Sequence, residues 1–197
     1  MRRVGFCFLL AALVWCGTLL ADRELLNEEL IRLHVVANSD SEEDQAIKLR
    51  VRDAVTESLR EAMEDVADVE EAKAYLQENL PKIQKVANDT LRSLGCTEEA
   101  VVTLCRQAFD TRYYDTFTLP AGVYDALRIT IGAGEGQNWW CVVFPTFCIP
   151  ATTEGFEDVA AGAGFPDALN EALTGEQEVR FFFLDALGKL ENLFFME

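Results

Sequence analysis

The sequence predicts an α+β fold, in which helices and strands occupy separate stretches of the chain. Residues 31–37 alternate between apolar and polar side chains, as a half-buried strand does. Residues 41–94 instead repeat their apolar side chains at helical spacing. Residues 100–144 hold apolar runs separated by glycine and proline, which is typical of strands and turns. We therefore expect an N-terminal strand, long helices, an antiparallel hairpin-rich sheet, and a C-terminal strand and helix.

The N-terminus has the layout of an export signal. Two arginines precede the uncharged run Val4–Ala21, and Asp22 ends it. We expect residues 1–21 to be a secretory signal that is cleaved after Ala21. The alternative is an uncleaved anchor, because about 18 apolar residues are just long enough to span a bilayer. In both cases the remaining chain lies outside the cytoplasm.

Composition divides the rest of the chain into three parts. Residues 22–150 carry the strand and helix patterns and form the expected core. Residues 151–177 are rich in alanine, glycine and acids and lack lysine and arginine, so we expect a surface excursion with a short helix near 167–173. Residues 178–197 return to the core, with a strand over 179–184 and then a closing helix.

The charge of the chain argues against two kinds of partner. The sequence has 17 lysines and arginines against 34 acidic residues, a formal net charge of −17. Nucleic acid is not expected as a partner, because its phosphates require basic residues. Docking on anionic lipid through a basic patch is not expected either.

Two long helices are expected after the first strand. A capping box formed by Ser39 with Glu42, or by Ser41 with Asp44, begins a helix that continues to about residue 66. A second helical stretch begins near residue 69. Pro81 is expected to interrupt it and to open a new helix, because proline lacks the backbone donor of an intrahelical bond. Gly95 is expected to end that helix.

Strands dominate the next part of the chain. We expect one strand over 100–109, and a turn at 119–122 leading into a second strand over 123–131. A glycine-rich turn at 132–136 then returns the chain as a third strand over 138–144. Since a short turn joins the last two strands, they are expected to pair as a hairpin.

Four cysteines follow the signal, and an exported chain permits disulfides. Six residues, including a proline, lie between Cys141 and Cys148, so this local pair is our first choice. Cys96 and Cys105 flank a second candidate loop, although Cys105 is equally interpreted as a buried free thiol. Four cysteines allow three complete pairings, and all remain open. With a single histidine and no C-x-x-C motif, we expect no metal and no cofactor.

The residues that carry chemistry are few. His34 is the only histidine, and with Cys141 it would form a Cys–His nucleophile, which keeps an exported cysteine hydrolase as an alternative function. The acidic run at 40–44 fails as a calcium loop, because Gln45 stands where glycine is required and Val51 where glutamate is required. We assign no catalytic residue.

Two features indicate binding instead. Gln45, Lys48 and Arg52 share one helix face and form a basic island in an acidic chain, although a solvated face with an Asp44–Lys48 pair explains them equally. Adjacent residues of a strand face opposite sides, so both rings of Trp139-Trp140 are buried only if the sheet is covered on both faces. An exposed tryptophan is typical of an interface.

Three blocks of this sequence resemble the stage II sporulation protein R family. They are Ile31–Gln45 with its continuation Lys48–Val55, Leu119–Arg128, and Gly136–Pro145 followed by Cys148. The resemblance implies a protein that the forespore exports into the space between the forespore and mother-cell membranes. There it would activate a membrane-embedded aspartic peptidase that processes pro-sigma-E, with no hydrolytic activity of its own.

The surface for that peptidase is expected where the resemblance and the binding features coincide. The candidate residues are Asn38, Ser39, Asp40, Asp44, Gln45, Lys48, Arg52, Trp139 and Trp140. These residues are equally interpreted as determinants of the fold. A structural envelope protein anchored by residues 4–21 is a further alternative.

Overall fold

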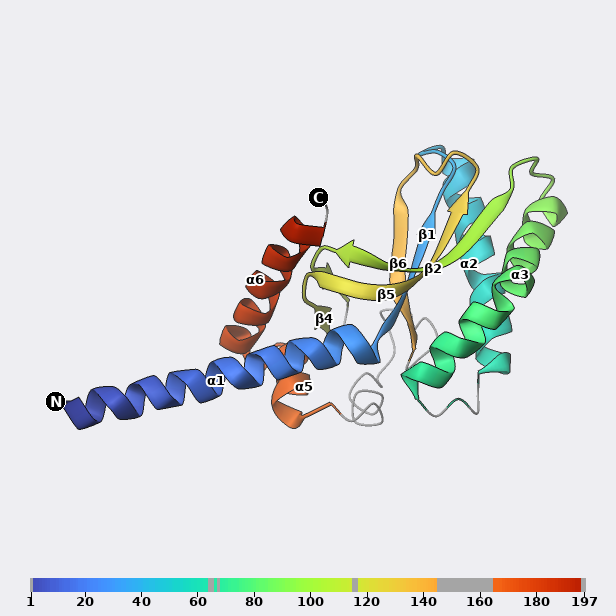
Figure 1. The fold of residues 1–197 in the computed structure, drawn as a ribbon. Helices are drawn as coiled ribbons and strands as arrows, with labels where there is room; N and C mark the ends of the chain where they lie inside the picture. Colours follow the sequence, from blue (N-terminus) through green and yellow to red (C-terminus); the bar gives the residue numbers. More distant parts are fainter. Residues whose placement is uncertain (1, 64–65, 67, 115–116, 145–164, 196–197) are drawn as a thin grey trace. The chain divides into compact units, whose positions relative to one another are not determined.

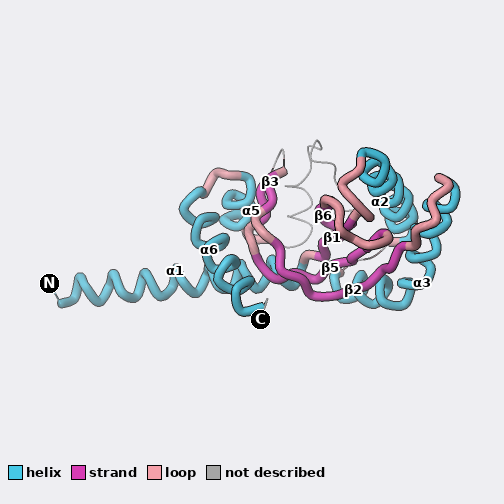
Figure 2. Tube along the Cα trace, turned by 90° about the horizontal axis from the view of Figure 1, so that it is seen from above, coloured by secondary structure: helices cyan, strands magenta, loops and turns pink. Residues whose placement is uncertain are grey.

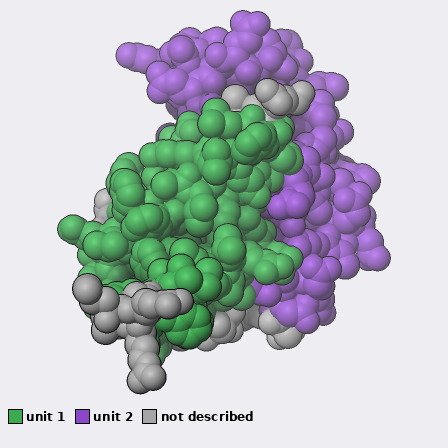
Figure 3. Space-filling view, turned by 60° about the vertical axis from the view of Figure 1, so that its left-hand side comes forward, with its two compact units in different colours: residues 1–28, 108–123, 154–197 green, residues 29–107, 124–153 purple. Residues whose placement is uncertain are grey.

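The structure is a computed structural model, and it describes all of the 197 residues except 1, 64–65, 67, 115–116, 145–164 and 196–197. The chain divides into two compact units (Figure 3). Unit 1 contains residues 1–28, 108–123 and 154–197, and unit 2 contains residues 29–107 and 124–153. The overall class is α+β, as predicted.

A four-stranded mixed sheet is the framework of unit 2 (Figure 1). Its strands are β1 (Ile31–Val36), β2 (Ala100–Phe109), β5 (Gly122–Ile131) and β6 (Asn138–Phe144). Their order across the sheet is β2-β5-β1-β6. β1 is parallel to β5 and antiparallel to β6, so strands from distant parts of the sequence meet at β1.

The predicted hairpin of β5 and β6 is wrong, because β1 lies between these two strands. All six residues of β1 are buried, whereas the alternating pattern predicted a half-buried strand. When both edges of a strand are paired, its backbone N–H and C=O groups bond to the neighbouring strands, so the strand can be buried without unpaired polar groups. The long-range pairing of β1 therefore overrides the local signal for a hairpin.

Two helices cover one face of this sheet (Figures 1 and 2). They are α2 (Glu42–Ala62) and α3 (Val69–Ser93). Ser41 caps α2 by accepting a hydrogen bond from the backbone N–H of Asp44 at 3.1 Å, as the second predicted capping box requires, whereas the Ser41 N–H donates to the Ser39 hydroxyl at 3.2 Å rather than to Asp44. Apolar residues of both helices join Leu33, Val35 and Leu127 in a single core cluster.

Pro81 does not interrupt the second helix as predicted, because α3 is continuous through it. Pro81 and Gln77, whose carbonyl would accept the missing bond, are both exposed. Water can therefore satisfy that carbonyl, which lowers the penalty of an internal proline. The predicted end of the helix is confirmed, since Gly95 has φ +79° and the Cys96 N–H donates to the Leu91 carbonyl at 3.0 Å.

Unit 1 is mainly helical. Its elements are α1 (Arg2–Glu29), β3 (Arg112–Tyr113), β4 (Thr118–Leu119), α5 (Asp167–Thr174) and α6 (Glu178–Phe195). The short helix expected near residue 167 is α5. The expected strand over 179–184 is wrong, because these residues begin α6; a short apolar run does not by itself separate strand from helix. Most of the expected excursion lies outside the described residues.

The expected signal segment forms the first part of α1. Residues 6–29 are long and apolar enough to cross a membrane, by length and composition alone. A signal sequence near the N-terminus satisfies the same criteria. The helix is therefore compatible with a signal and with an anchor.

We expect Leu127→Ala to destabilise the chain by about 2–5 kcal/mol, because it removes a fully buried side chain from the centre of the sheet. The midpoint of chemical denaturation measures this loss. Val101→Ala is the matched control on β2, where the side chain is 56% exposed, and it should change stability by no more than about 0.5 kcal/mol. Equal losses for both variants would contradict the assigned core.

Candidate functional site

The candidate Cys–His pair does not form. Directly opposed residues of paired strands share a face, and β1 places Leu33 opposite Cys141 and His34 opposite Trp140. Cys141 therefore points into the helix-covered core with Leu33, while His34 points to the other face of the sheet. Cys141 is also disulfide-bonded. The hypothesis of a Cys141–His34 nucleophile is thus wrong.

The candidate pairing of Cys96 with Cys105 is wrong as well, since both cysteines are free. Cys96 follows the end of α3, whereas Cys105 lies five residues into β2. An extended strand advances about 3.3 Å per residue, and a disulfide requires Cα atoms within about 7 Å. Cys148, the expected partner of Cys141, lies outside the described residues, so this pairing stays a prediction.

Asp44 lies in the first turn of α2 and binds the loop that joins β1 to α2. Its carboxylate accepts hydrogen bonds from the side-chain amide of Asn38 at 3.0 Å and from the hydroxyl of Ser39 at 2.5 Å. The side-chain amide of Gln45 also donates to the Ser39 carbonyl at 2.9 Å. The bond from Ser39, followed by the bond from Asn38, holds the pKa of Asp44 below its usual value. These contacts fix the loop against the first turn of α2.

The connection between β5 and β6 binds the same loop. The side-chain oxygen of Asn38 accepts from the Ala133 N–H at 2.9 Å, and the carboxylate of Asp40 accepts from the Gln137 N–H at 2.7 Å. The N–H of Gly136 donates to the carbonyl of Ala37 at 3.0 Å. A Cβ atom on Gly136 would lie 2.2 Å from the Ser39 carbonyl oxygen, so only glycine permits this approach.

Lys48 links α2 to this connection. Its ammonium donates to the side chain of Gln45 at 2.5 Å and to the carbonyl of Gln137 at 2.9 Å. Only 5% of Lys48 is exposed, and burial, with a smaller contribution from Arg52, lowers its pKa. The alternative Asp44–Lys48 ion pair is wrong, because Asp44 is engaged by the loop. Lys48 is thus a structural bridge rather than an open cationic surface.

Arg52 lies one turn further along α2. Its guanidinium carbon lies 4.1 Å from the centroid of the Trp139 ring, which is a cation–π contact. The same guanidinium donates to the carboxylate of Asp53 at 2.5–2.8 Å. Both Arg52 and Trp139 are half-buried, so the pair covers the edge of the helix-facing core.

The two tryptophans face opposite sides of the sheet, as predicted for adjacent strand residues. Trp140 stacks on His34 with ring centroids 3.8 Å apart, and the Nδ1 atom of His34 lies 3.0 Å from the side-chain oxygen of Gln107. Both tryptophans are half-buried. Trp140 therefore belongs to a different environment from the other candidate residues.

The structure brings together all of the predicted site residues except Trp140. We call this group the loop–helix cluster, and it consists of Asn38, Ser39, Asp40, Asp44, Gln45, Lys48, Arg52 and Trp139. Most of its polar groups are bonded to one another or to the β5–β6 connection. The cluster therefore determines the local fold, and contact with a partner stays a prediction for its exposed edge.

Sequence reasoning missed the polar residues that lie inside unit 2. Arg32 is fully buried, and its guanidinium lies 5.2 Å from the centroid of the Tyr124 ring. The alternation of Arg32 and His34 with apolar residues was the available signal, but it was interpreted as a solvent face. Among the residues that the structure describes, no group of three or more histidine, cysteine or acidic side chains is placed to hold a metal ion.

We expect Asp44→Asn to lower stability at pH 6 by about 1 kcal/mol, because it removes a charge-assisted acceptor of two hydrogen bonds. The folded state lowers the pKa of Asp44 below 3.8. Its contribution is therefore complete above that value and disappears as the pH falls through the lowered pKa. Urea midpoints at pH 6 and pH 3 should show wild type and variant converging at the lower pH.

Ser39→Ala is the matched variant, since it keeps the carboxylate and removes its principal donor. At pH 6 this variant should be less stable than wild type. Between pH 6 and pH 3 it should lose less stability than wild type loses. If the stabilities of wild type and Asp44→Asn change identically between pH 6 and pH 3, Asp44 is not the group whose titration lowers stability in acid.

Comparison with known proteins identifies the family of this chain. A family model described as stage II sporulation protein R (spore_II_R) matches residues 27–154. The stage II sporulation protein R of Bacillus subtilis (strain 168) is 38% identical over 124 residues, which are 63% of this chain and 55% of that protein. The match thus spans about half the length of this relative. No solved structure matches. Because the family match covers more than half of the chain, including the whole loop–helix cluster, this chain belongs to the stage II sporulation protein R family.

Proposed function

We propose that this chain is an exported sporulation signal that activates a membrane-embedded aspartic peptidase and so starts the processing of pro-sigma-E. The observation that carries the proposal is the family match over residues 27–154. The apolar N-terminal helix supports export, because a signal and an anchor both place the following chain outside the cytoplasm. The separation of His34 from Cys141 supports a role in binding over the alternative of a cysteine hydrolase.

Activation by such a ligand is a shift of population. A peptidase that exchanges between inactive and active arrangements is activated only by a ligand that binds the active arrangement more tightly. A ligand whose binding surface is already ordered loses less conformational entropy on binding. The internal hydrogen bonds of the loop–helix cluster supply that order, because they hold the loop, the start of α2 and the β5–β6 connection together.

The proposed contact surface is the exposed edge of the loop–helix cluster together with the neighbouring Glu42 and Glu43, which are not members of the cluster. Asp40, Glu42 and Glu43 are exposed and lie at the N-terminal end of α2. The cationic members of the cluster are less accessible, because Lys48 is buried and Arg52 is half-buried. The part of the cluster that reaches solvent is therefore acidic, and it favours a partner with a basic surface.

Reconstitution in a non-sporulating host tests the function itself. The full chain is co-expressed with the peptidase and with pro-sigma-E, and processing is followed by the size of the sigma protein. We expect processing only when this chain is present with its N-terminal segment. The control lacks residues 1–21, stays in the cytoplasm and should give no processing. Equal processing with and without this chain would overturn the proposal.

A charge-neutralised variant tests the contact surface. Asp40→Asn, Glu42→Gln and Glu43→Gln together remove three exposed charges, and the Asn side-chain oxygen still accepts the bond from Gln137. We expect processing to fall roughly tenfold, which corresponds to about 1.4 kcal/mol of lost binding.

The matched control neutralises the same number of exposed acids elsewhere in unit 2. Glu57→Gln, Glu61→Gln and Glu78→Gln lie on α2 and α3, away from the loop. This control should process pro-sigma-E normally. If the variant and its control give the same processing at equal protein levels, the acidic edge is not the contact.

A further inference from the structure

Helix α6 presents a continuous apolar stripe to solvent. Its members recur three or four residues apart over the whole helix and consist of Val179, Phe182, Phe183, Ala186, Leu190, Leu193 and Phe194. All are exposed, and the large side chains of Phe182 and Phe194 are 65% and 74% exposed. Lys189 borders the stripe and pairs with the carboxylate of Asp185 at 2.7 Å. A surface helix of a soluble protein normally has the opposite pattern, with its apolar side turned inward.

The opposite side of α6 fixes this orientation. At Gly188 a Cβ atom would lie 1.6 Å from the Ala121 carbonyl oxygen, so the helix backbone packs directly on the chain there. The carboxylate of Asp185 accepts from the Ala121 N–H at 2.9 Å. The side-chain amide of Asn192 donates to the Phe109 carbonyl at 2.8 Å. Turning the stripe inward would break these contacts, so the apolar side stays outside.

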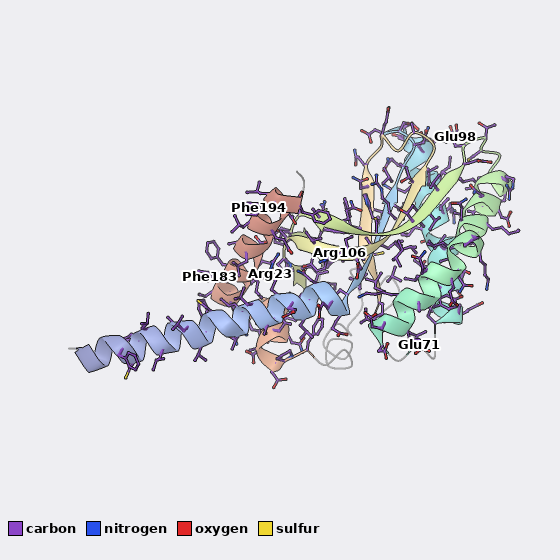
Figure 4. The ribbon with its side chains drawn as sticks, viewed as in Figure 1. Arg23, Glu71, Glu98, Arg106, Phe183 and Phe194 are labelled. Carbon is purple, nitrogen blue, oxygen red and sulfur yellow. The ribbon has the colours of Figure 1, made fainter. Side chains whose placement is uncertain are left out.

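The stripe is continuous with the candidate membrane helix. Ion pairs join Arg180 to Asp22 and Glu191 to Arg23, and so hold α6 against α1 (Figure 4). Phe183 lies on the side of α6 toward the N-terminal half of α1, and its ring contacts Trp15 with centroids 5.0 Å apart. The large apolar residues of α1 before Trp15 are exposed as well. Unit 1 thus has one apolar surface formed by two helices.

We propose that the outward stripe of α6 lies against the lipid bilayer that α1 enters, at the boundary between headgroups and acyl chains. The inference rests on the alternative in which residues 1–21 remain as an uncleaved anchor, and it is independent of peptidase activation. An amphipathic helix with phenylalanine and leucine on one face binds a bilayer by burying that face. An exposed apolar patch of this extent otherwise promotes aggregation.

The charge of the chain specifies the mode of binding. With a net charge of −17, the protein gains nothing from anionic headgroups, so attachment depends on apolar burial. Binding should therefore be no stronger on anionic than on zwitterionic membranes, and it should not be weakened by salt. The stripe lies beyond the family match, which ends at residue 154, so this contact is a property of unit 1 rather than of the loop–helix cluster.

Site-specific photocrosslinking tests the contact in the full chain. The photoreactive residue p-benzoylphenylalanine replaces Phe182 or Phe194 in separate variants, and membranes of an exporting bacterial host are irradiated. Mass spectrometry is expected to find lipid adducts at both positions. The matched control carries the same residue at Tyr113, which is 80% exposed and also in unit 1, and it should form at least tenfold less lipid adduct.

Every other result overturns the proposal. A crosslink to a second copy or to another protein at Phe182 and Phe194 would assign the stripe to a protein interface. Equal lipid adducts at all three positions, or none, would show that the stripe has no specific contact with lipid. The substituted residues are exposed aromatic side chains, so loss of folding does not explain a negative result.

Vesicles separate apolar burial from charge attraction. The Phe194 variant is reconstituted in phosphatidylcholine alone and in mixtures with phosphatidylglycerol, at low salt and in 1 M NaCl. The yield of lipid adduct should not rise when phosphatidylglycerol is added, and it should persist in 1 M NaCl. A large increase with phosphatidylglycerol that salt abolishes would contradict binding by apolar burial. Neither peptidase nor sigma factor is present, so the result does not depend on the proposed signalling function.

Discussion

Unit 2 depends on the complete burial of β1 between β5 and β6. Its side chains reach both faces of the sheet, with Leu33 in the helix-covered core and Arg32 and His34 on the other face. Because both edges of β1 are paired, the chain cannot connect β5 to β6 as a simple hairpin. The β5–β6 connection instead passes the end of β1, where the loop to α2 begins. The pairing of β1 thus decides which loops meet.

The loop–helix cluster forms because the loop after β1 and the β5–β6 connection come together. The loop after β1 needs partners for its polar groups, and the β5–β6 connection offers the backbone N–H groups of Ala133 and Gln137. Asp44 then joins the loop to α2, and Lys48 joins α2 to the β5–β6 connection. The same residues therefore serve the fold and form a surface to which loop, helix and connection all contribute. The proposed contact is therefore no alternative to the structural role, since the internal bonds create the surface.

Local signals in the sequence predicted most elements but not their pairing. The cap at Ser41, the end of α3 at Gly95 and the short helix α5 follow from side-chain chemistry within a few residues. The position of β1, the continuity of α3 through Pro81 and the helical state of residues 179–184 depend on distant contacts or on solvent. The candidate site was found because its residues are close in sequence to one another. The environment of His34 and Trp140 could not be found in this way, because their contact depends on the register of β1 against β6.

The two units differ in where the apolar residues of their helices lie. In unit 2 the apolar faces of α2 and α3 close on the sheet, and most charged residues of these helices, with Lys48 as an exception, reach solvent. In unit 1 the side of α6 that packs inward carries Leu184 together with Asp185, Glu191 and Asn192, whose polar groups bond within the unit, and the apolar stripe is left outside. Composition alone does not reveal which side of α6 faces outward, because the same helix, if rotated about its axis, would bury its apolar stripe as an ordinary core helix does. The polar contacts with Arg23, Ala121 and Phe109 decide the rotation and keep the apolar stripe outside.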